Sequence, residues 1–158
     1  MDKVLSRQEA KALLDTVRQA GKRIVFTNGC FDILHVGHVR YLKAAKSLGD
    51  LLVLGLNSDA SVRGLKGDRR PLVPEAERAE VLAGLESVDC VILFDEDTPL
   101  SLIRDLQPHI LVKGGDWPED RIVGAAEVRS WGGRVVVAPL VEGRSTTNVV
   151  EKILQVYR

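Results

Sequence analysis

The 158-residue sequence has little cysteine, few aromatic residues, no excess of either charge and no long hydrophobic run. Its two cysteines, Cys30 and Cys90, form neither a CxxC pair nor a disulfide framework, so we expect a reducing, cytoplasmic compartment. The 22 Lys and Arg balance the 22 Asp and Glu, and bulk electrostatics therefore give no reason to expect nucleic acid or an anionic membrane as a partner. Apolar runs such as residues 51–56 are too short to span a bilayer, and the first residues lack the apolar core of a secretory signal.

The sequence does have enough apolar residues to form one ordinary core. Hydrophobic residues make up 45% of it and charged residues 28%, which is typical of a soluble globular fold. A chain of 158 residues leaves little room for a second domain. We therefore expect a single domain over residues 1–158, with an N-terminal helix in residues 1–21 and a core in residues 22–158.

The pattern of residues 6–21 predicts an amphipathic helix. Ser6 and Glu9 have the spacing of a capping box, in which each side chain bonds the backbone amide of the other residue. Apolar residues recur behind them at helical intervals, and Gly21 marks the end.

Beyond residue 21, short apolar runs alternate with amphipathic stretches. The expected strands cover residues 24–27, 51–56, 88–93, 110–112 and 135–138. The expected helices cover residues 38–48, 75–85, 99–106, 122–131 and 146–157. The strand runs are almost continuously apolar, as in parallel strands that are buried on both faces. Repeated strand–helix–strand units with short links predict an α/β, Rossmann-like fold, a three-layer α/β/α sandwich around a doubly wound, five-stranded parallel sheet.

Open parallel sheets bind ligands at the carboxyl ends of their strands, so the residues after each strand form the candidate site. The segment after the first strand lacks the G-x-G-x-x-G fingerprint of a dinucleotide site and instead contains His35 and His38 on either side of Gly37. Gly37 lets a ligand approach the backbone closely, and the free amides at the start of the following helix favour an anion. We expect both histidines to project toward that anion.

Three interpretations of the histidine pair compete. The side chains pack or cap the helix, they bind a metal, or their imidazole N–H groups bind phosphate oxygens as negative charge develops there. A zinc site needs further ligands, and neither His109 nor the cysteines are well placed to supply them. We favour the third interpretation.

Residues 63–71 carry four basic residues and one acidic residue, interleaved with glycines. One interpretation is a solvated surface loop. The other is a mobile lid whose Lys66 neutralises bound phosphate groups. Arg63, Arg69 and Arg70 are weaker candidates for the same role.

Two further segments follow predicted strands. Gly114 and Gly115 permit the tight backbone approach that a purine or its ribose requires. Asp116 accepts hydrogen bonds from ribose hydroxyls, holds Mg²⁺ through water, or caps the next turn. Residues 145–147, three hydroxyl residues at the start of the last helix, suit the β- and γ-phosphates of a nucleotide, and one of them is expected to cap the helix.

Together these segments resemble the HxGH nucleotidyltransferase superfamily. Residues 29–38 contain its HxGH motif. Residues 57–59, 65–67, 112–116 and 143–147 are similar to one subgroup, the adenylyltransferase domain of ADP-heptose synthesis. The resemblance covers about residues 20–157, and these four blocks in order are more specific than HxGH alone.

The resemblance makes residues 22–158 a catalytic core and implies a role for each matching residue. Catalytic roles fall to His35, His38 and Lys66, and substrate binding falls to Asn57, Arg63 and Lys66. Nucleotide binding falls to Cys30, Phe31, Asp32, His35, Gly37, His38, Lys113, Gly114, Gly115, Asp116, Arg144, Ser145, Thr146 and Thr147. The resemblance further implies that Mg²⁺ enters with ATP and that no protein side chain holds a metal directly.

A reaction is implied as well. An oxygen of D-glycero-β-D-manno-heptose 1-phosphate attacks the α-phosphorus of ATP, which gives an ADP-sugar and pyrophosphate without a covalent enzyme intermediate. Cytidylyl transfer to glycerol 3-phosphate or another small phosphate is the alternative with the same mechanism. A non-catalytic nucleotide-binding module is the alternative from another class. A separate sugar kinase as pathway neighbour and a homodimer are further expectations.

Overall fold

The computed structural model describes residues 2–115, 117–139 and 144–157 of the chain. Its strands are β1 (Ile24–Gly29), β2 (Leu51–Asn57), β3 (Cys90–Phe94), β4 (Ile110–Gly114) and β5 (Arg134–Ala138). Its helices are α1 (Arg7–Gln19), α2 (Val36–Lys46), α3 (Asp59–Lys66), α4 (Glu75–Ala83), α5 (Leu100–Leu106), α6 (Ala125–Ser130) and α7 (Thr146–Val156), with a 3₁₀ turn η1 (Glu119–Arg121) before α6. The predicted alternation of strands and helices is confirmed.

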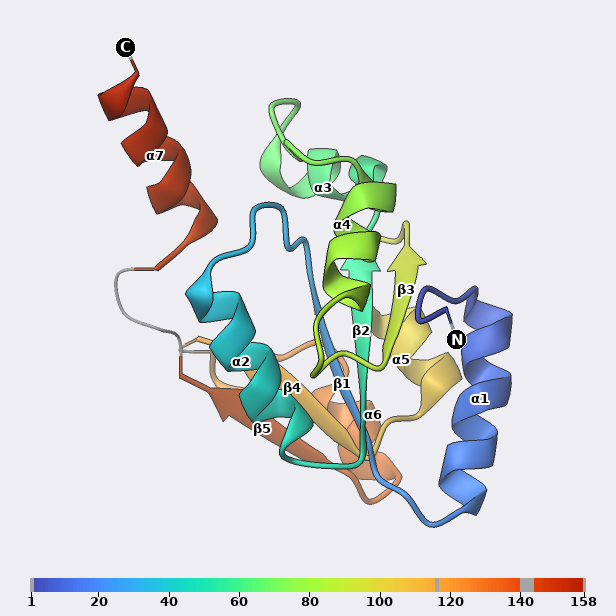
Figure 1. Ribbon diagram of the computed structural model, residues 1–158. Coiled ribbons are helices and arrows are strands. Elements are labelled where there is room, and N and C mark those ends of the chain that lie inside the picture. Colours follow the sequence, from blue (N-terminus) through green and yellow to red (C-terminus); the bar gives the residue numbers. More distant parts are fainter. Residues whose placement is uncertain (1, 116, 140–143, 158) are drawn as a thin grey trace.

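The five strands form one parallel sheet with the order β3-β2-β1-β4-β5 (Figure 1). From β1 the chain moves outward through β2 to β3, and it then crosses to the other side of β1 to form β4 and β5. The direction of winding therefore reverses between β1 and β4. In open α/β sheets such a reversal opens a crevice at the carboxyl ends of the strands, here near Gly29 and Gly114.

Helices cover both faces of the sheet (Figure 1). On one face, α1, α5 and α6 pack against sheet residues such as Phe26 and Ile92. On the other face, α2 and α4 pack against residues such as Val25 and Leu54. Val25 and Phe26 are neighbours in β1, yet they lie in opposite cores and both are fully buried. This burial on two sides explains why the strand sequences are nearly continuously apolar.

Two expectations about local structure have different outcomes. The capping box of α1 is confirmed, because Ser6 Oγ accepts a hydrogen bond from the Glu9 amide at 3.1 Å and the Glu9 carboxylate accepts one from the Ser6 amide at 3.2 Å. The expectation of a loop from residue 63 is wrong for its first part, because α3 extends to Lys66. Ser58 caps α3 by accepting a hydrogen bond from the Ser61 amide at 3.2 Å. The sequence prediction gave more weight to the glycines of this segment than to the serine that caps the helix.

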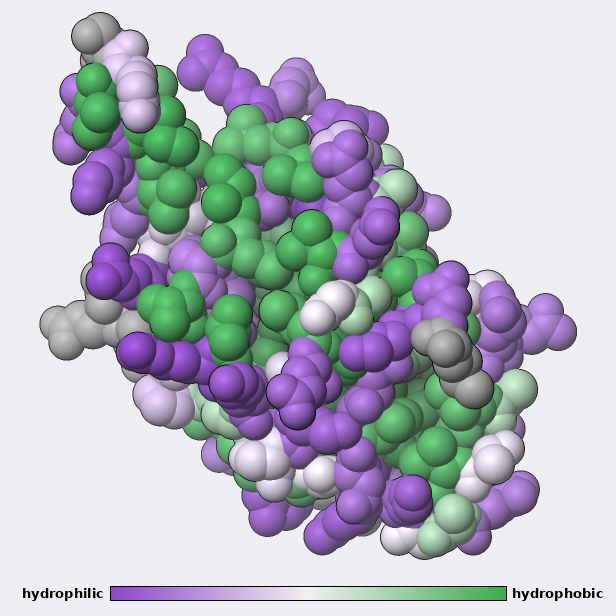
Figure 2. Space-filling view, in the orientation of Figure 1, coloured by the Kyte–Doolittle hydropathy of each residue, from purple (hydrophilic) through white to green (hydrophobic). Residues whose placement is uncertain are grey.

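The C-terminal helix α7 packs less than the others. None of its described residues is buried, and its exposed apolar residues include Ile153, Leu154 and Val156. Figure 1 shows α7 standing apart from the sheet, and Figure 2 shows apolar side chains gathered over it at the upper left. Across the described part of the chain, no helix has the length and apolar character that crossing a bilayer requires.

Candidate active site

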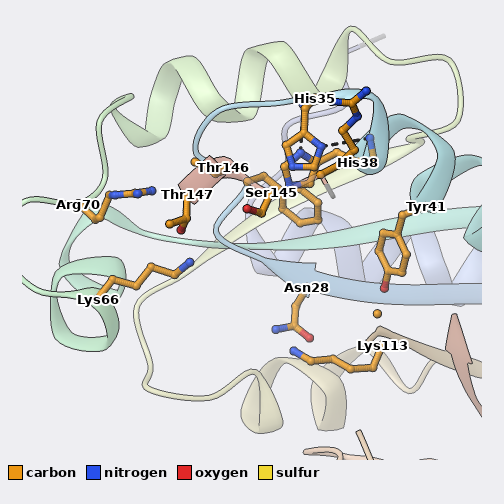
Figure 3. A pocket seen from close by; sticks show the side chains of 14 residues that line it. Asn28, His35, His38, Tyr41, Lys66, Arg70, Lys113, Ser145, Thr146 and Thr147 are labelled. Carbon is orange, nitrogen blue, oxygen red and sulfur yellow. Dashed lines mark hydrogen bonds between the residues drawn. The ribbon is translucent and has the colours of Figure 1, made fainter. Parts of the chain in front are cut away.

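A cavity of about 320 Å³ lies at the carboxyl ends of β1 and β4 (Figure 3). Its walls come from the ends of these strands, the start of α2, the end of α3 with the loop that follows, and the start of α7. The lining residues are Asn28, Phe31, His35, Gly37, His38, Tyr41, Lys66, Arg70, Lys113, Gly114, Arg144, Ser145, Thr146 and Thr147. Segments that are far apart in the sequence thus meet where the winding of the sheet reverses.

Two histidines open α2 inside this cavity. Nδ1 of His35 accepts a hydrogen bond from the Gly37 amide at 3.1 Å, and Nδ1 of His38 accepts one from the His35 amide at 3.2 Å. Their ring centroids are 4.0 Å apart. A Cβ atom on residue 37 would lie 2.8 Å from Cε1 of His35. Glycine at this position therefore lets the His35 imidazole lie against the first turn of the helix.

These hydrogen bonds determine which ring nitrogen carries the proton. A neutral imidazole that accepts at Nδ1 carries its proton on Nε2. Burial and, to a smaller extent, Arg144 lower the pKa of His35, while burial, His35 and Lys66 lower the pKa of His38 to about 4. Both rings are therefore neutral at neutral pH, and each has one Nε2–H donor for a ligand in the cavity.

Four basic side chains line the same cavity, namely Lys66, Arg70, Lys113 and Arg144. Among the described residues, no carboxylate lines it. Burial lowers the pKa of Lys113, because removal from water disfavours its charged form. The expectation of free amides at the start of α2 is wrong for Gly37 and His38, whose amides bond Nδ1 and the carbonyl oxygen of His35. The basic side chains alone therefore make the cavity suit a polyanion such as a nucleoside triphosphate.

Asp32 positions the segment that carries Arg70. Its carboxylate accepts hydrogen bonds from the amides of Leu72 at 2.9 and 3.0 Å and of Val73 at 2.9 Å, and Arg70 Nη1 lies 3.6 Å from it. Asp32 is only 8% exposed. Its oxygens thus contact the chain beyond α3, so its effect on the cavity passes through Arg70.

Arg78 joins the ends of β1 and β2. It is 1% exposed, and it donates hydrogen bonds to the carbonyl oxygens of Val73, Cys30 and Asn57 at 2.7–2.9 Å. It also pairs with Asp59 at 2.7 Å. One guanidinium therefore ties the ends of β1 and β2 to α3 and α4. Its charged partner lies on a different helix, so helical spacing in the sequence gives no sign of it.

The three hydroxyl residues at the start of α7 make different contacts. Ser145 Oγ accepts a hydrogen bond from the Asn148 amide at 3.0 Å, which confirms the expected cap. Thr146 Oγ1 donates to the Ile33 carbonyl at 2.9 Å and so links α7 to the loop before α2. Thr147 is exposed and lines the cavity (Figure 3).

Most of the predicted site residues meet at the cavity, and five described ones do not line it. Those five are Cys30, Asp32, Asn57, Arg63 and Gly115. Asn57 is buried and donates from Nδ2 to Ser61 Oγ at 2.9 Å, whereas Arg63 is exposed on α3. Burial raises the pKa of the Cys30 thiol, which keeps it protonated. Asp116 lies outside the described residues.

Sequence reasoning missed two lining residues, Asn28 and Tyr41, and ranked Arg70 too low. Tyr41 follows His38 by three residues and so lies on the same helix face, a spacing that could have identified it. Its hydroxyl bonds Thr27 Oγ1 at 2.6 Å and the Val112 carbonyl at 3.2 Å. Within the described chain, no group of three or more His, Cys, Asp or Glu side chains suits a metal ion.

Comparison with known protein families gives one match over most of this fold. Residues 26–152 match the family described as cytidylyltransferase-like. Among curated proteins, the bifunctional protein HldE of Pelobacter propionicus is 57% identical over 155 residues, which is 98% of this chain and 32% of that protein. HldE of Geobacter metallireducens is 61% identical over 145 residues, or 92% of this chain and 30% of that protein. The chain spans about a third of the length of these relatives.

Solved structures with the same fold include a lipopolysaccharide core biosynthesis protein from Thermoplasma volcanium. It superposes with a TM-score of 0.62 at 29% identity, over 78% of this chain and 100% of that one. Pantothenate synthetase from Thermus thermophilus superposes with a TM-score of 0.61 at 19% identity, over 93% of this chain and 67% of that one. The second likeness concerns the fold alone.

Proposed function

The chain belongs to the cytidylyltransferase-like family, and on that premise we propose that it transfers AMP from ATP to a sugar 1-phosphate and releases pyrophosphate. One observation carries the proposal. Two neutral imidazoles, held by backbone amides at Nδ1, keep their Nε2–H donors for a cavity lined by four basic side chains. A protein that only binds a nucleotide does not need neutral N–H donors in addition to four cations. An enzyme that stabilises the charge developing on phosphate oxygens during transfer does need them.

The triphosphate binds across the cavity. Its β- and γ-phosphates lie against the first turn of α7, where Thr147 and Arg144 face the cavity. Lys66 and Arg70, from α3 and the loop that follows, neutralise the same phosphates from the other side. The α-phosphate then lies near His35 and His38.

The transfer is a direct in-line displacement. An oxygen of the acceptor phosphate forms a bond to the α-phosphorus as the bond to the α,β-bridging oxygen breaks, and pyrophosphate leaves with that electron pair. His35 and His38 donate their Nε2–H groups to the phosphate oxygens on which charge develops. Positioning and charge stabilisation supply the rate, so no residue forms a covalent intermediate.

Mg²⁺ is proposed to enter on the phosphate oxygens of ATP. The lining supports this route, because its described residues offer hydroxyl and amide oxygens but no carboxylate that would hold the ion directly. When bound, the ion supplies further neutralisation of phosphate charge.

The proposed acceptor is D-glycero-β-D-manno-heptose 1-phosphate. Support comes from the subgroup blocks in the sequence and from 57–61% identity to the bifunctional HldE proteins. Phosphoryl transfer to the sugar is one reaction that supplies a sugar 1-phosphate, and a sugar kinase is the proposed pathway neighbour.

The test is pyrophosphate release with ATP, CTP, GTP and UTP against a panel of acceptors, with the products identified by mass spectrometry. We expect turnover with ATP and the heptose 1-phosphate, and a product with the mass of an ADP-heptose. Turnover with CTP and glycerol 3-phosphate instead would favour cytidylyl transfer. Binding of ATP with no turnover on any acceptor would favour a non-catalytic module.

A further inference from the structure

A second cavity of about 100 Å³ adjoins the first. The residues that line it are Asn28, Pro99, Lys113, Trp117, Arg121, Ile122 and Val123. Asn28 and Lys113 line both cavities, so they stand at the border between the two. We propose that this second cavity holds the sugar of the acceptor, with Trp117 as the surface on which the sugar ring packs and Lys113 as the contact of its phosphate. The inference rests on the proposed function and deepens it.

Trp117 is placed unlike the other tryptophan of the chain. Trp131 packs against the core and donates from Nε1 to the Pro108 carbonyl at 2.9 Å. Trp117 is 54% exposed. What distinguishes Trp117 is that its exposed ring lines the second cavity, where a bound ligand would cover it.

The chemistry of the second cavity fits a phosphorylated sugar. Pro99 and Ile122 are buried and give it an apolar floor beside the indole of Trp117, against which the C–H face of a sugar ring can pack. Asn28 and Arg121 offer donors to sugar hydroxyls. No carboxylate is present among the described lining residues, so the cavity does not suit a cationic acceptor.

Lys113 links the two cavities. Its Nζ lies 5.9 Å from the centroid of the Trp117 ring, and it lines the first cavity as well. An anionic group that binds this ammonium is therefore adjacent both to a sugar on Trp117 and to the reaction centre. A sugar 1-phosphate has its phosphate on the ring carbon itself, so it matches this short separation.

The layout also agrees with an in-line reaction. In Figure 3, Lys66, Arg70 and Thr147 lie at the left of the view, Asn28 and Lys113 lie at the lower centre, and the histidines lie at the upper right. Attacking and leaving oxygens must lie on opposite sides of the α-phosphorus. With pyrophosphate held by the first group, the second group lies apart from it and is left for the acceptor.

The test measures the KM of each substrate in Trp117→Ala and Trp117→Phe. We expect Trp117→Ala to raise the KM for the heptose 1-phosphate at least about tenfold, and to change the KM for ATP less than about twofold. Trp117→Phe keeps an aromatic surface and should stay within about threefold of wild type. Val81→Ala, which alters a similarly exposed apolar residue outside both cavities, is the matched control.

Each other result has a distinct meaning. If Trp117→Ala raises the KM for ATP and not for the sugar phosphate, the second cavity holds the base and the inference is overturned. If neither KM changes while wild type turns over, the inference fails and the proposed function stands. If wild type releases no pyrophosphate with any sugar 1-phosphate, the proposed function itself fails.

Discussion

The amide of His35 donates a hydrogen bond to Nδ1 of His38 at 3.2 Å, so the backbone of one histidine sets the tautomer of the other. The same turn directs the Gly37 amide to Nδ1 of His35 at 3.1 Å. Both rings therefore carry their proton on Nε2, and the start of α2 offers a pair of neutral donors at the cavity.

The first prediction concerns loss of one donor. His38→Ala should lower kcat at least about a hundredfold, because one transition-state hydrogen bond is lost. His38→Asn retains an oxygen that can accept from the His35 amide but places no donor where Nε2 lies, so it should fold normally and be nearly as slow. Steady-state pyrophosphate release measures both, and near-normal turnover in either variant would contradict the role assigned to His38.

The second prediction concerns pH and stability. The pKa of His38 is lowered to about 4 in the folded chain, from its ordinary 6.5. The unfolded state therefore binds a proton first as the pH falls, and the stabilisation present above pH 6.5 is lost progressively toward pH 4. Between about pH 7.5 and about pH 5, wild type should lose more unfolding free energy than His38→Asn in denaturant titrations. Equal losses in the two proteins would show that His38 is not buried as a neutral ring.

The third prediction concerns Asp32. Asp32→Asn removes a charge and one acceptor from the amides of Leu72 and Val73, which should lower the free energy of unfolding by about 1–3 kcal/mol. Because Arg70 loses its anchor, kcat/KM should fall between about tenfold and a hundredfold. Asp68→Asn, at an exposed position of the same segment, is the control and should change neither quantity. A change in stability without a change in kcat/KM would separate Asp32 from the site.

The fourth prediction concerns Arg78. Arg78→Ala leaves Asp59 and three carbonyl oxygens without their buried donor, which should cost about 3–5 kcal/mol of unfolding free energy. Arg104→Ala removes an arginine whose pair with Glu127 is exposed, and should cost less than about 1 kcal/mol. Chemical denaturation compares the two variants. Similar losses of unfolding free energy would show that the buried hydrogen bonds of Arg78 do not stabilise the fold more than an exposed ion pair does.

The fifth prediction separates the hydroxyl residues of α7. Ser145→Ala removes the cap from the Asn148 amide and should cost about 1 kcal/mol of stability. Thr147→Val should leave stability within about 0.5 kcal/mol and raise the KM for ATP, because Thr147 faces the cavity. Thermal denaturation and kinetics on the same samples check this, and an unchanged KM in Thr147→Val would remove that hydroxyl from the phosphate site.

The position of the candidate site could be predicted from the sequence, but the contacts of its individual side chains could not. The HxGH turn, the cationic segment and the hydroxyl turn each follow or precede a predictable element, and the side chains of His35, Lys66 and Thr147 do meet at the cavity. Asp32 was expected to bind nucleotide, yet its oxygens contact amides 40 and 41 residues away. Arg78 acts on a carbonyl 48 residues away. Patterns within a short stretch of sequence cannot predict contacts between residues that are 40 or more positions apart.

Sequence alone determined the parallel α/β sandwich, since strands buried on both faces must be apolar throughout and helices between them must be amphipathic. It also predicted a candidate site at the end of the first strand, where glycine lies between two histidines at a helix start, and these three residues do line the cavity. Tertiary structure decided which polar groups reach the cavity and which hold it together. A charged side chain has several partners within reach of its position in the chain, and only the packing of α3, α4 and α7 on the strand ends selects one of them.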